Sequence, residues 1–427
     1  MKYIQLVATT VLPAVLSLSA LAQIDPGVRN GSPGADGFID GLDAQSVGAV
    51  QNGKERFQEV DGVADGLGPR FNADSCAACH AHPTVGGSSP PQNPLKAIAT
   101  ANGATNSLPS FITDDGPVRE MRYISDGAVH ALFVITGRDD ALGCSIAQPD
   151  FDTQIKNGNI SLRIPTPIFG LGLVENTPDQ NLMADVAALS DQRQAMGIGG
   201  HFNYSGNDRT ITRFGWKAQN KSLLMFAGEA YNVETGVTNE LFPNKRDYDA
   251  TCQYNTLPED GTDLTQAEAS NSSSDVTLFA KFMQMTAPPR PANAETARGG
   301  QSDGLQAFNA AACNLCHIQS HTTAPSNIAG LSKVTYSPFS DFQVHAMGQN
   351  LADQIPQGYA AGNEFRTAPL WGIGQRVFFL HDGRTADLLD AIKEHASDGS
   401  EANGSVQKFL GLSKHQQQAI LNFLRNL

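Results

Sequence analysis

The sequence has little positive charge. It contains 29 Lys and Arg residues against 43 Asp and Glu residues, which gives a formal net charge of −14 over 427 residues. Proteins that bind nucleic acid neutralise phosphates with clustered Lys and Arg, so this balance argues against a nucleic-acid-binding surface. Apolar residues are not lacking: at 40 % hydrophobic and 17 % charged, the chain can bury a sizeable core, which argues against intrinsic disorder.

Long apolar runs are also scarce. The one run of note, residues 7–21, is interrupted by polar residues and a proline and is shorter than the roughly 20 apolar residues that cross a bilayer. Lys2 precedes it, and the small-residue pattern Ala20-Leu21-Ala22 closes it, as in a secretory signal. We therefore expect residues 1–22 to be an export signal that is cleaved before Gln23. The mature chain should be soluble, without an integral membrane segment, in an oxidising compartment.

Cysteine is limited to six residues. Four of them form two Cys-X-X-Cys-His motifs: Cys76, Cys79 and His80, and Cys313, Cys316 and His317. Two thiols one helical turn apart can add to the two vinyl groups of haem, and the adjoining histidine then faces the iron as its proximal ligand. A zinc site would need further Cys or His pairs, and a redox dithiol would need a thioredoxin-like context. The motifs therefore predict two covalently bound c-type haems.

The other two cysteines, Cys144 and Cys252, lie far apart in the sequence and have no metal-binding or redox spacing. Exported proteins usually pair their spare thiols, so we favour a structural disulfide between them. A catalytic thiol is the alternative. It is less favoured because neither cysteine has an obvious local activator.

Each haem motif follows a short segment with the apolar spacing of a helix. Residues 53–57 precede the first motif, and residues 304–308 precede the second. Each segment is typical of the amphipathic helix that opens a cytochrome c unit and leads the chain into the attachment loop. Two such units are therefore expected.

A further helix is predicted over residues 276–283, where apolar residues recur at helical spacing, and Pro288-Pro289 should end it. The polar stretch that follows marks a domain boundary. We expect an N-terminal cytochrome c-like domain with large insertions over residues 23–290 and a C-terminal cytochrome c-like domain over residues 291–427.

The predicted fold class is mainly α, with long loops. At the C-terminus, Ser413 and Gln416 form a capping box before an apolar helical face. Evidence for strands is thin: residues 131–136 and 377–380 are the only segments that we predict as short strands, and neither alternates well.

Three runs carry a resemblance to a known family: FNADSCAACHAHPTVGGSSPPQNP, RFGWKAQNKSLLMFAGEAYNVETGVTNELFP and EFRTAPLWGIGQRVFFLHDGRTADLLDAIKEH. They resemble the bacterial di-haem oxidoreductases, also called thiol-oxidoreductase-like. This family is similar to the di-haem cytochrome c peroxidases and to the di-haem enzyme that matures methylamine dehydrogenase. The resemblance spans nearly all of the mature chain. It implies a periplasmic enzyme with two cytochrome c domains, in which one haem reacts and the other passes electrons.

The resemblance also implies an axial ligand for the C-terminal haem. In the peroxidases, a His-Asp-Gly turn is followed on a helix by a Met ligand; here the turn that begins at His381 leads to His395 at the same spacing. Leu388, Ile392 and His395 are spaced i, i+4, i+7, which places the imidazole on a buried helix face. We expect His395 to bind the iron and to lower its potential relative to a His and Met pair. Met347 is the competing ligand, and His381 is expected to order the turn or a haem propionate.

The N-terminal haem lacks an obvious second ligand. The peroxidases place a removable distal histidine some way after the first motif, but no histidine here has the matching spacing, and His82 is too close to His80. Two options follow: an open iron, or ligation by His130. His201 is a weaker choice because it lies in a glycine-rich loop. An open or labile iron suits peroxide chemistry, since the oxidant must bind before its O–O bond breaks.

Three further residues are candidates for catalysis. Peroxide cleavage needs a group that moves a proton between the two oxygens, and Glu229 and Glu240 are the carboxylates proposed for it. The segment that contains them resembles the peroxidase segment that supplies a tryptophan between the haems and, later, a distal Glu. Trp216 is therefore expected to relay electrons between the irons, although ordinary core packing would also explain a tryptophan there.

The favoured function is thus a periplasmic di-haem c-type oxidoreductase of the peroxidase type. Peroxide is the expected oxidant, and a small redox protein or a small molecule is the expected electron donor. A non-enzymatic di-haem electron carrier, or a redox partner in ferrous iron handling, is the alternative. Thiol oxidation ranks last because the sequence shows no reactive dithiol. The family analogy also allows a calcium ion between the haems, without assigning its ligands.

Overall fold

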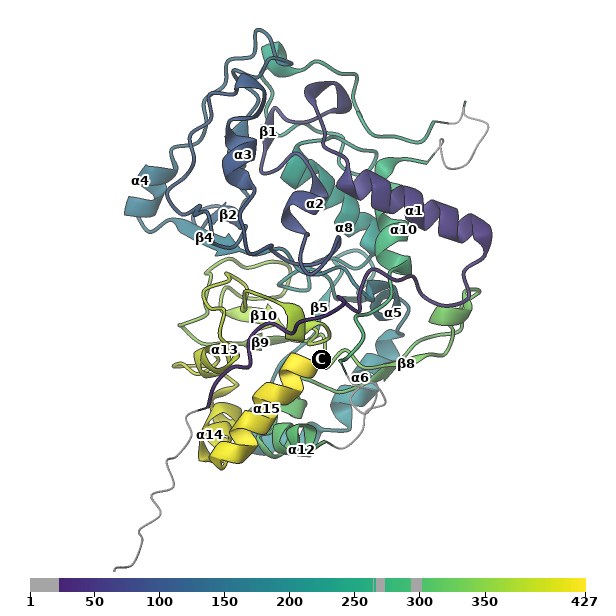
Figure 1. Cartoon of the computed structure of the whole chain (residues 1–427), viewed down its shortest axis with the longest axis vertical. Helices are drawn as coiled ribbons and strands as arrows, with labels where there is room; N and C mark the ends of the chain where they lie inside the picture. The colour runs from purple at the N-terminus through teal and green to yellow at the C-terminus, as the bar shows by residue number, and fades with distance from the viewer. Residues whose placement is uncertain (1–22, 264, 266–272, 293–301) are drawn as a thin grey trace, which may run out of the picture.

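A computed structural model describes residues 23–263, 265, 273–292 and 302–427. The expected export signal, residues 1–22, lies outside the described residues. None of the helices in these ranges is long and apolar enough to cross a bilayer. Long loops connect the elements, and two lobes of helices are stacked along the longest axis of the molecule (Figure 1).

Most regular structure is helical. The helices of the first 292 residues are α1 (Ala44–Gln58), α2 (Cys76–Cys79), α3 (Leu95–Ala99), α4 (Phe151–Lys156), α5 (Leu171–Glu175), α6 (Asp179–Ala187), α7 (Ser190–Met196), α8 (Leu223–Ala230) and α10 (Asp275–Met285). A π-helical turn, η3 (Tyr231–Thr235), continues α8. The later helices are α12 (Asp303–Ala310), α13 (Leu388–Glu394), α14 (Asn403–Gly411) and α15 (Lys414–Asn426), with 3₁₀ turns η5 (Cys313–Leu315) and η7 (Ile373–Gln375).

The strands of the described residues are short and form only two-stranded antiparallel sheets. The pairs are β1 (Arg70–Phe71) with β3 (Phe133–Val134), β2 (Glu120–Tyr123) with β4 (Ile160–Arg163), β5 (Asn203–Tyr204) with β6 (Ile211–Thr212), β7 (His321–Thr322) with β8 (Thr335–Tyr336), and β9 (Val344–Ala346) with β10 (Glu364–Arg366). This small amount of sheet is compatible with the predicted mainly α class.

The expected elements are found with few changes. Residues 53–57 lie in the last part of α1, residues 304–308 lie in α12, and α10 ends three residues before Pro288. The capping box of Ser413 and Gln416 is present at the start of α15. Local signals of capping and proline position therefore located these helices correctly.

The two strand predictions had different outcomes. The segment 131–136 contains β3, which is only two residues long. The segment 377–380 forms no strand; Phe379 makes a single bridge to Thr385 across the His-Asp-Gly turn. Of the four apolar residues there, only Phe379 is buried, and the chain bends instead of pairing, so hydrophobicity alone misled the prediction.

Each haem motif is supported by the same helix packing. Gly53 of α1 packs against α10, and a Cβ there would lie 2.3 Å from the Leu278 carbonyl oxygen. Gly304 of α12 packs against α15, and its Cβ would lie 2.4 Å from the Ala419 carbonyl oxygen. Both glycines are needed because the helix backbones approach so closely.

An aromatic residue follows each of these glycines by one helical turn. Phe57 contacts Phe282 and the ring of His80, with centroids 5.3 and 5.8 Å apart. Phe308 contacts Phe423 and the ring of His317, with centroids 5.7 and 6.1 Å apart. The two motif histidines are thus positioned by equivalent contacts, and the chain contains a structural repeat around its two motifs.

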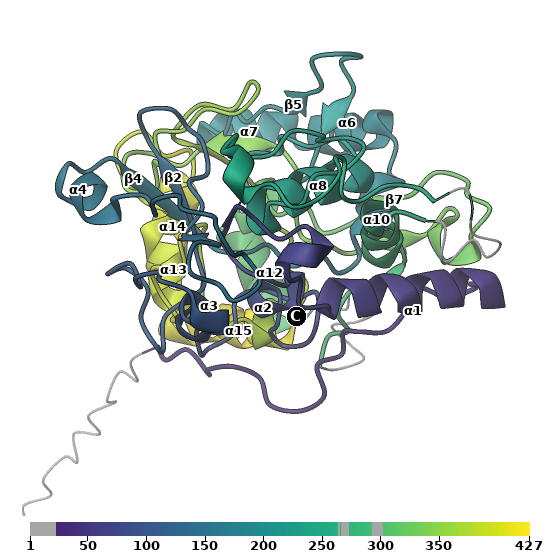
Figure 2. The same cartoon turned by 90° about the horizontal axis from the view of Figure 1, so that it is seen from above.

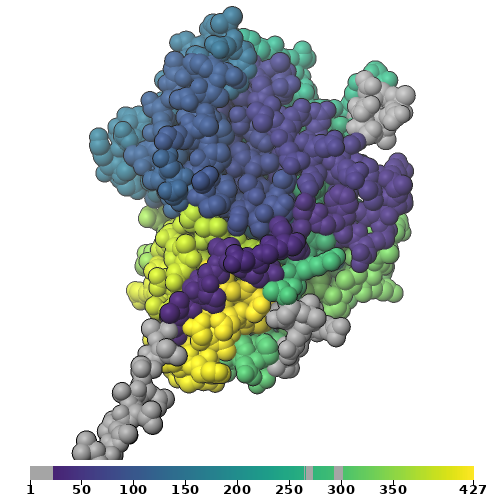
Figure 3. Space-filling view, viewed as in Figure 1, coloured from purple at the N-terminus to yellow at the C-terminus, as the bar shows by residue number. Residues whose placement is uncertain are grey.

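One hydrophobic cluster takes residues from both sides of the expected domain boundary near residue 290. The largest hydrophobic cluster takes residues from Ile39 to Trp371, and it includes residues of α5, α8 and α10. The N-terminal segment runs between the lobes: α1 lies in the upper lobe of Figure 1, and the residues before it lie against the lower lobe. There, the Asp25 carboxylate forms an ion pair with the Arg425 guanidinium of α15, with a nitrogen–oxygen distance of 2.6 Å. Figure 3 shows this purple segment lying across the yellow C-terminal helices. Figure 2 shows the two lobes overlapping when they are seen from above.

Cys144 and Cys252 are joined by a disulfide, with an S–S distance of 2.04 Å and a Cα–Cα distance of 4.6 Å. Both cysteines are buried in a second hydrophobic cluster, which takes its residues from Val63 to Cys252. The four motif cysteines are free thiols. Pairing the two spare cysteines links segments that are 108 residues apart in the sequence.

Candidate functional site

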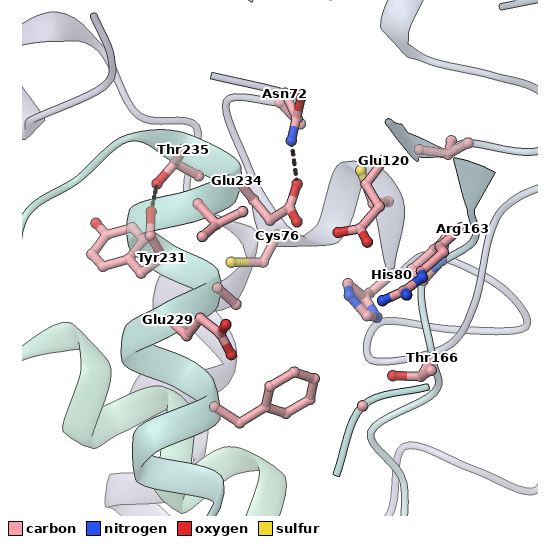
Figure 4. Close-up of a pocket in the computed structure, with 18 of the residues that line it drawn as sticks. Asn72, Cys76, His80, Glu120, Arg163, Thr166, Glu229, Tyr231, Glu234 and Thr235 are labelled. Atoms are coloured by element: carbon pink, nitrogen blue, oxygen red, sulfur yellow. Dashed lines mark hydrogen bonds between the residues drawn. The ribbon is translucent and has the colours of Figure 1, made fainter. Parts of the chain in front are cut away.

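Among the described residues, each Cys-X-X-Cys-His motif lines a cavity of its own. Cys76, Cys79 and His80 line the first, and Cys313, Cys316 and His317 line the second. Both walls are largely apolar, with a few charged groups. Figure 4 shows the first cavity, with Cys76 and His80 at its wall. Trp216 lines both cavities and therefore stands between them.

Three histidines have the hydrogen bonding of metal ligands. The Nδ1 atom of His80 lies 3.0 Å from the Gly87 carbonyl oxygen. The Nδ1 atom of His317 lies 2.9 Å from the Phe339 carbonyl oxygen, and that of His395 lies 2.7 Å from the Ala391 carbonyl oxygen. A carbonyl only accepts, so Nδ1 carries the hydrogen at these contacts and leaves Nε2 with the lone pair in a neutral ring. His80 also has the Thr166 backbone as a hydrogen-bond partner. Metal-bound histidines are oriented in this way.

Burial keeps these three rings neutral. It lowers the pKa of His80 and of His317 to about 4, and it also lowers the pKa of His395. A neutral imidazole is the form that binds iron. The three histidines are therefore suited to iron at neutral pH.

The second cavity brings two of these histidines together. His317 and His395 both line it, and His395 lies at the C-terminal end of α13, directly after Glu394. Met347 lines the same cavity, so the geometry admits the competing ligand as well. His381 also lines it, but its ring stacks on Phe365 with centroids 4.2 Å apart.

The first cavity has a different set of side chains. His80 is the one histidine that lines it among the described residues. His130 lies elsewhere: its Nε2 is 3.0 Å from the Asp126 carboxylate, and its ring stacks on Tyr123. His201 is bound to Glu364 and does not line the cavity either. The suggestion that His130 binds the iron is therefore not supported, because a partly exposed carboxylate holds the imidazole outside the cavity.

The two proposed catalytic carboxylates have different positions. Glu229 of α8 lines the first cavity and accepts a hydrogen bond from Asn220. Glu240 is exposed, and its carboxylate accepts from the Thr262 backbone N–H at 3.0 Å. The chain leaves the cavity after η3, where Gly236 takes φ +81°. Glu240 does not line the cavity, so the structure does not support the prediction that it is a distal base there.

Two other carboxylates, which the sequence did not reveal, face the first cavity. Glu234 of η3 and Glu120 of β2 both line it and hydrogen bond to each other. The Asn72 amide donates to Glu234 at 2.7 Å. In Figure 4, Glu234 and Glu229 project from the teal helix, and Glu120 faces them from the other side. Glu234 lies five residues after Glu229 in a run that carries the resemblance, whereas nothing local marks Glu120.

The pKa values of the Glu234 and Glu120 carboxyl groups are shifted in opposite directions. Burial, together with the charge of Glu120, raises the pKa of Glu234 to about 8. Burial would also raise the pKa of Glu120, but the charges of Arg122 and Arg163 outweigh it and lower that pKa. Glu120 and Arg163 are directly opposed in the β2–β4 pair. The pair therefore holds one proton at neutral pH, mainly on Glu234.

Trp216 lies in the loop between β6 and α8, and three contacts hold it. Its Nε1 donates to the Ile164 carbonyl oxygen at 2.9 Å. Its own carbonyl oxygen accepts from the Arg366 backbone N–H at 2.8 Å, and its ring is edge-on to His381 with centroids 6.4 Å apart. It is thus fixed at the boundary of the cavities rather than buried in a core.

No group of three or more His, Cys, Asp or Glu side chains in the described residues is arranged to hold a metal ion. The calcium ion that the family analogy allows stays a prediction without assigned ligands.

Two cavities, each with a Cys-X-X-Cys-His motif and both lined by one tryptophan, are the arrangement expected of a di-haem redox protein. The family model described as "Di-haem oxidoreductase, putative peroxidase" matches residues 128–427. The chain belongs to this family. The matched region includes Trp216, the second motif and His395, whereas the first motif precedes it. No curated protein matches the chain in sequence.

Proposed function

We propose that the protein is an exported, periplasmic c-type di-haem enzyme that reduces peroxide. The first cavity would be the reactive site, and the second would receive electrons from a small redox protein or a small molecule. When bound, haem supplies a redox-active iron and a coordination position where the O–O bond of peroxide is cleaved. The family membership supports the oxidoreductase class, and the geometry of the cavities supports the assignment of roles.

The residues present fit covalent haem in both cavities. Each cavity offers two free thiols and a neutral imidazole from one motif. Burial raises the pKa of Cys313 to about 12 and raises that of Cys76 and Cys79 as well. Such thiols are poor nucleophiles for thiol redox chemistry. Cys76 and Cys79 would hold one haem and Cys313 and Cys316 the other, with His80 and His317 on the irons.

One observation carries the assignment of roles: the second cavity offers two suitably bonded imidazoles, and the first offers one. His317 and His395 would give the second iron two protein ligands. In the first cavity, His80 stands with carboxyls and not with a second histidine of the described residues. The first iron would therefore keep a position for peroxide, which is what catalysis at a haem requires.

The carboxyl pair would move the protons. Reduction of one peroxide to two waters takes up two electrons and two protons. Ionised Glu120 can accept a proton from the oxygen that binds, and protonated Glu234 can donate one to the oxygen that leaves. Arg122 and Arg163 keep Glu120 ionised for this task. Glu229, which is held by Asn220, is the third carboxyl at the cavity and stands one helical turn from Glu234.

The test is the spin state of the oxidised protein combined with peroxide turnover. Electron paramagnetic resonance should show one high-spin and one low-spin ferric haem in equal amounts, and the protein should consume peroxide when a reduced donor is supplied. Two low-spin haems together with no peroxide consumption would overturn the proposal. That outcome would favour the alternative hypothesis, a non-enzymatic di-haem electron carrier.

A further inference from the structure

Two arginines at the second cavity lack a counter-ion. Arg366 of β10 and Arg376, which follows η7, both line the cavity, and each is only 7 % exposed. Neither forms an ion pair with any described residue. The Arg366 Nε donates to the Gly215 carbonyl oxygen at 2.8 Å, and the buried Arg376 Nε has no hydrogen-bond partner.

Other buried arginines of the described chain are paired with carboxylates. Arg163 pairs with Asp353, Arg193 with Asp341, Arg213 with Asp179 and Arg425 with Asp25. Burial, together with the charge of Arg376, instead lowers the pKa of Arg366 to about 10, and burial lowers the pKa of Arg376 to about 10. Two buried like charges near one another are costly unless an anion joins them.

We propose that Arg366 and Arg376 bind the propionates of the haem in the second cavity. Haem carries two carboxylates on one edge, which matches two guanidinium groups in number and charge. A guanidinium donates two parallel N–H groups to a carboxylate, so it binds such a group with defined geometry. His381, which the sequence suggested for a propionate, is not suited to an ion pair because burial lowers its pKa to about 4. This inference rests on the proposed haem at this cavity.

Both arginines are positioned by residues that are far from them in the sequence. The Arg366 side chain bonds to Gly215, and its backbone N–H bonds to the Trp216 carbonyl oxygen. The residue before Arg376 is Gln375, whose carbonyl oxygen accepts from His82 Nε2 at 2.8 Å. His82 stands two residues after the first motif. Propionates bound by these arginines would thus be held in a fixed position relative to Trp216 and to the loop of the first motif.

The test is the reduction potential of each haem in the full di-haem protein, measured by spectroelectrochemistry in Arg366→Gln and Arg376→Gln. A nearby positive charge favours ferrous over ferric iron. Each Gln variant should lower the ferrous-to-ferric ratio of the second haem about tenfold at fixed potential, which is about 59 mV for one electron. The first haem should change much less. Arg376→Lys keeps the charge and should retain most of the parent potential.

Arg213→Gln is the matched control, since Arg213 is equally buried but pairs with Asp179 and lines neither cavity. It should leave both potentials unchanged. Should both cavity variants carry two haems at the parent potentials, the proposal is overturned while the di-haem function stands. Loss of haem from the parent protein itself would instead remove the proposed function.

If the Gln variants fail to fold, infrared difference spectra of the parent protein with ¹³C-labelled propionates decide the question. Propionates paired with guanidinium should stay ionised as the pH is lowered through the ordinary range of a carboxylic acid, about 4. Protonation of all labelled propionates in that range would overturn the proposal.

Discussion

Trp216 stands edge-on to His381, with ring centroids 6.4 Å apart and an interplanar angle of 75°. Trp216 lines both cavities, and His381 lines the second. The two residues are also linked through Ile164, whose carbonyl oxygen accepts from the Trp216 indole and whose N–H donates to the His381 carbonyl oxygen at 2.7 Å. These contacts form a short covalent and hydrogen-bonded route between the sites, and they suggest where electrons would cross.

Trp216→Phe should slow electron transfer between the haems. Phenylalanine keeps a ring but loses the indole and its hydrogen bond to Ile164. We expect slower transfer in stopped-flow spectra after mixing with peroxide, with both haems retained. Trp371→Phe is the control, because Trp371 is buried in the core and lines neither cavity. Equal transfer rates in both variants would exclude Trp216 as the relay.

The second prediction concerns haem load. The mature protein should carry two covalent haems, and Cys316→Ala should weaken attachment in the second cavity because only Cys313 can still form a thioether there. Mass spectrometry of the intact chain and a haem assay should show the first haem unchanged. A single haem on the parent chain, made with full maturation machinery, would refute the assignment of both motifs.

His395→Met should raise the potential of the second haem. A thioether donates less to ferric iron than an imidazole does, so the ferrous form gains relative stability. The iron should stay low-spin. The ferrous-to-ferric ratio at fixed potential should rise about tenfold or more, which corresponds to a rise in reduction potential of about 59 mV or more. Met347→Leu is the control and should leave the potential as it is. If Met347→Leu changes the spin state and His395→Met does nothing, Met347 is the ligand.

Glu234→Gln should slow the reaction with peroxide by about 10²- to 10⁴-fold, the usual loss for a proton-transferring group. Glutamine keeps the size and can still bond to Asn72, so both haems should remain. Glu240→Gln is the matched control and should react like the parent, because Glu240 is exposed outside the cavity. Glu229→Gln tests the remaining carboxyl of the same helix. A Glu234→Gln variant as fast as the parent would remove the carboxyl pair from the mechanism.

The rate of peroxide consumption should fall as the pH rises through about 8. Burial and the charge of Glu120 raise the pKa of Glu234 to about 8, so the pair keeps its proton below that pH and loses it above. The proton donor is then absent. The initial rate measured as a function of pH should show this fall. The Glu234→Gln variant should not show it, because glutamine does not ionise. A parent profile that is flat from pH 6 to 10 would contradict the assignment.

The sequence by itself predicted the haem-attachment motifs and located the main helices. A Cys-X-X-Cys-His motif is local, so five consecutive residues suffice to predict attachment. Helix ends are also local: Ser413 with Gln416 starts α15, and Pro288 follows the end of α10. The spacing from His381 to His395 lies within one turn and one helix, and the structure places both residues at the second cavity.

Only the tertiary structure decided which charged residues reach the cavities. Glu120 arrives on a strand pair far from either motif, and Glu234 is turned inward by a π-helical turn that no spacing rule anticipates. Arg366 and Arg376 depend on contacts with the loop at Gly215 and with His82. Glu240 and His130 have suitable chemistry but are held at the surface. The reason is physical: periodicity and capping report on neighbours along the chain, whereas the burial of a charge is set by residues a hundred or more positions away.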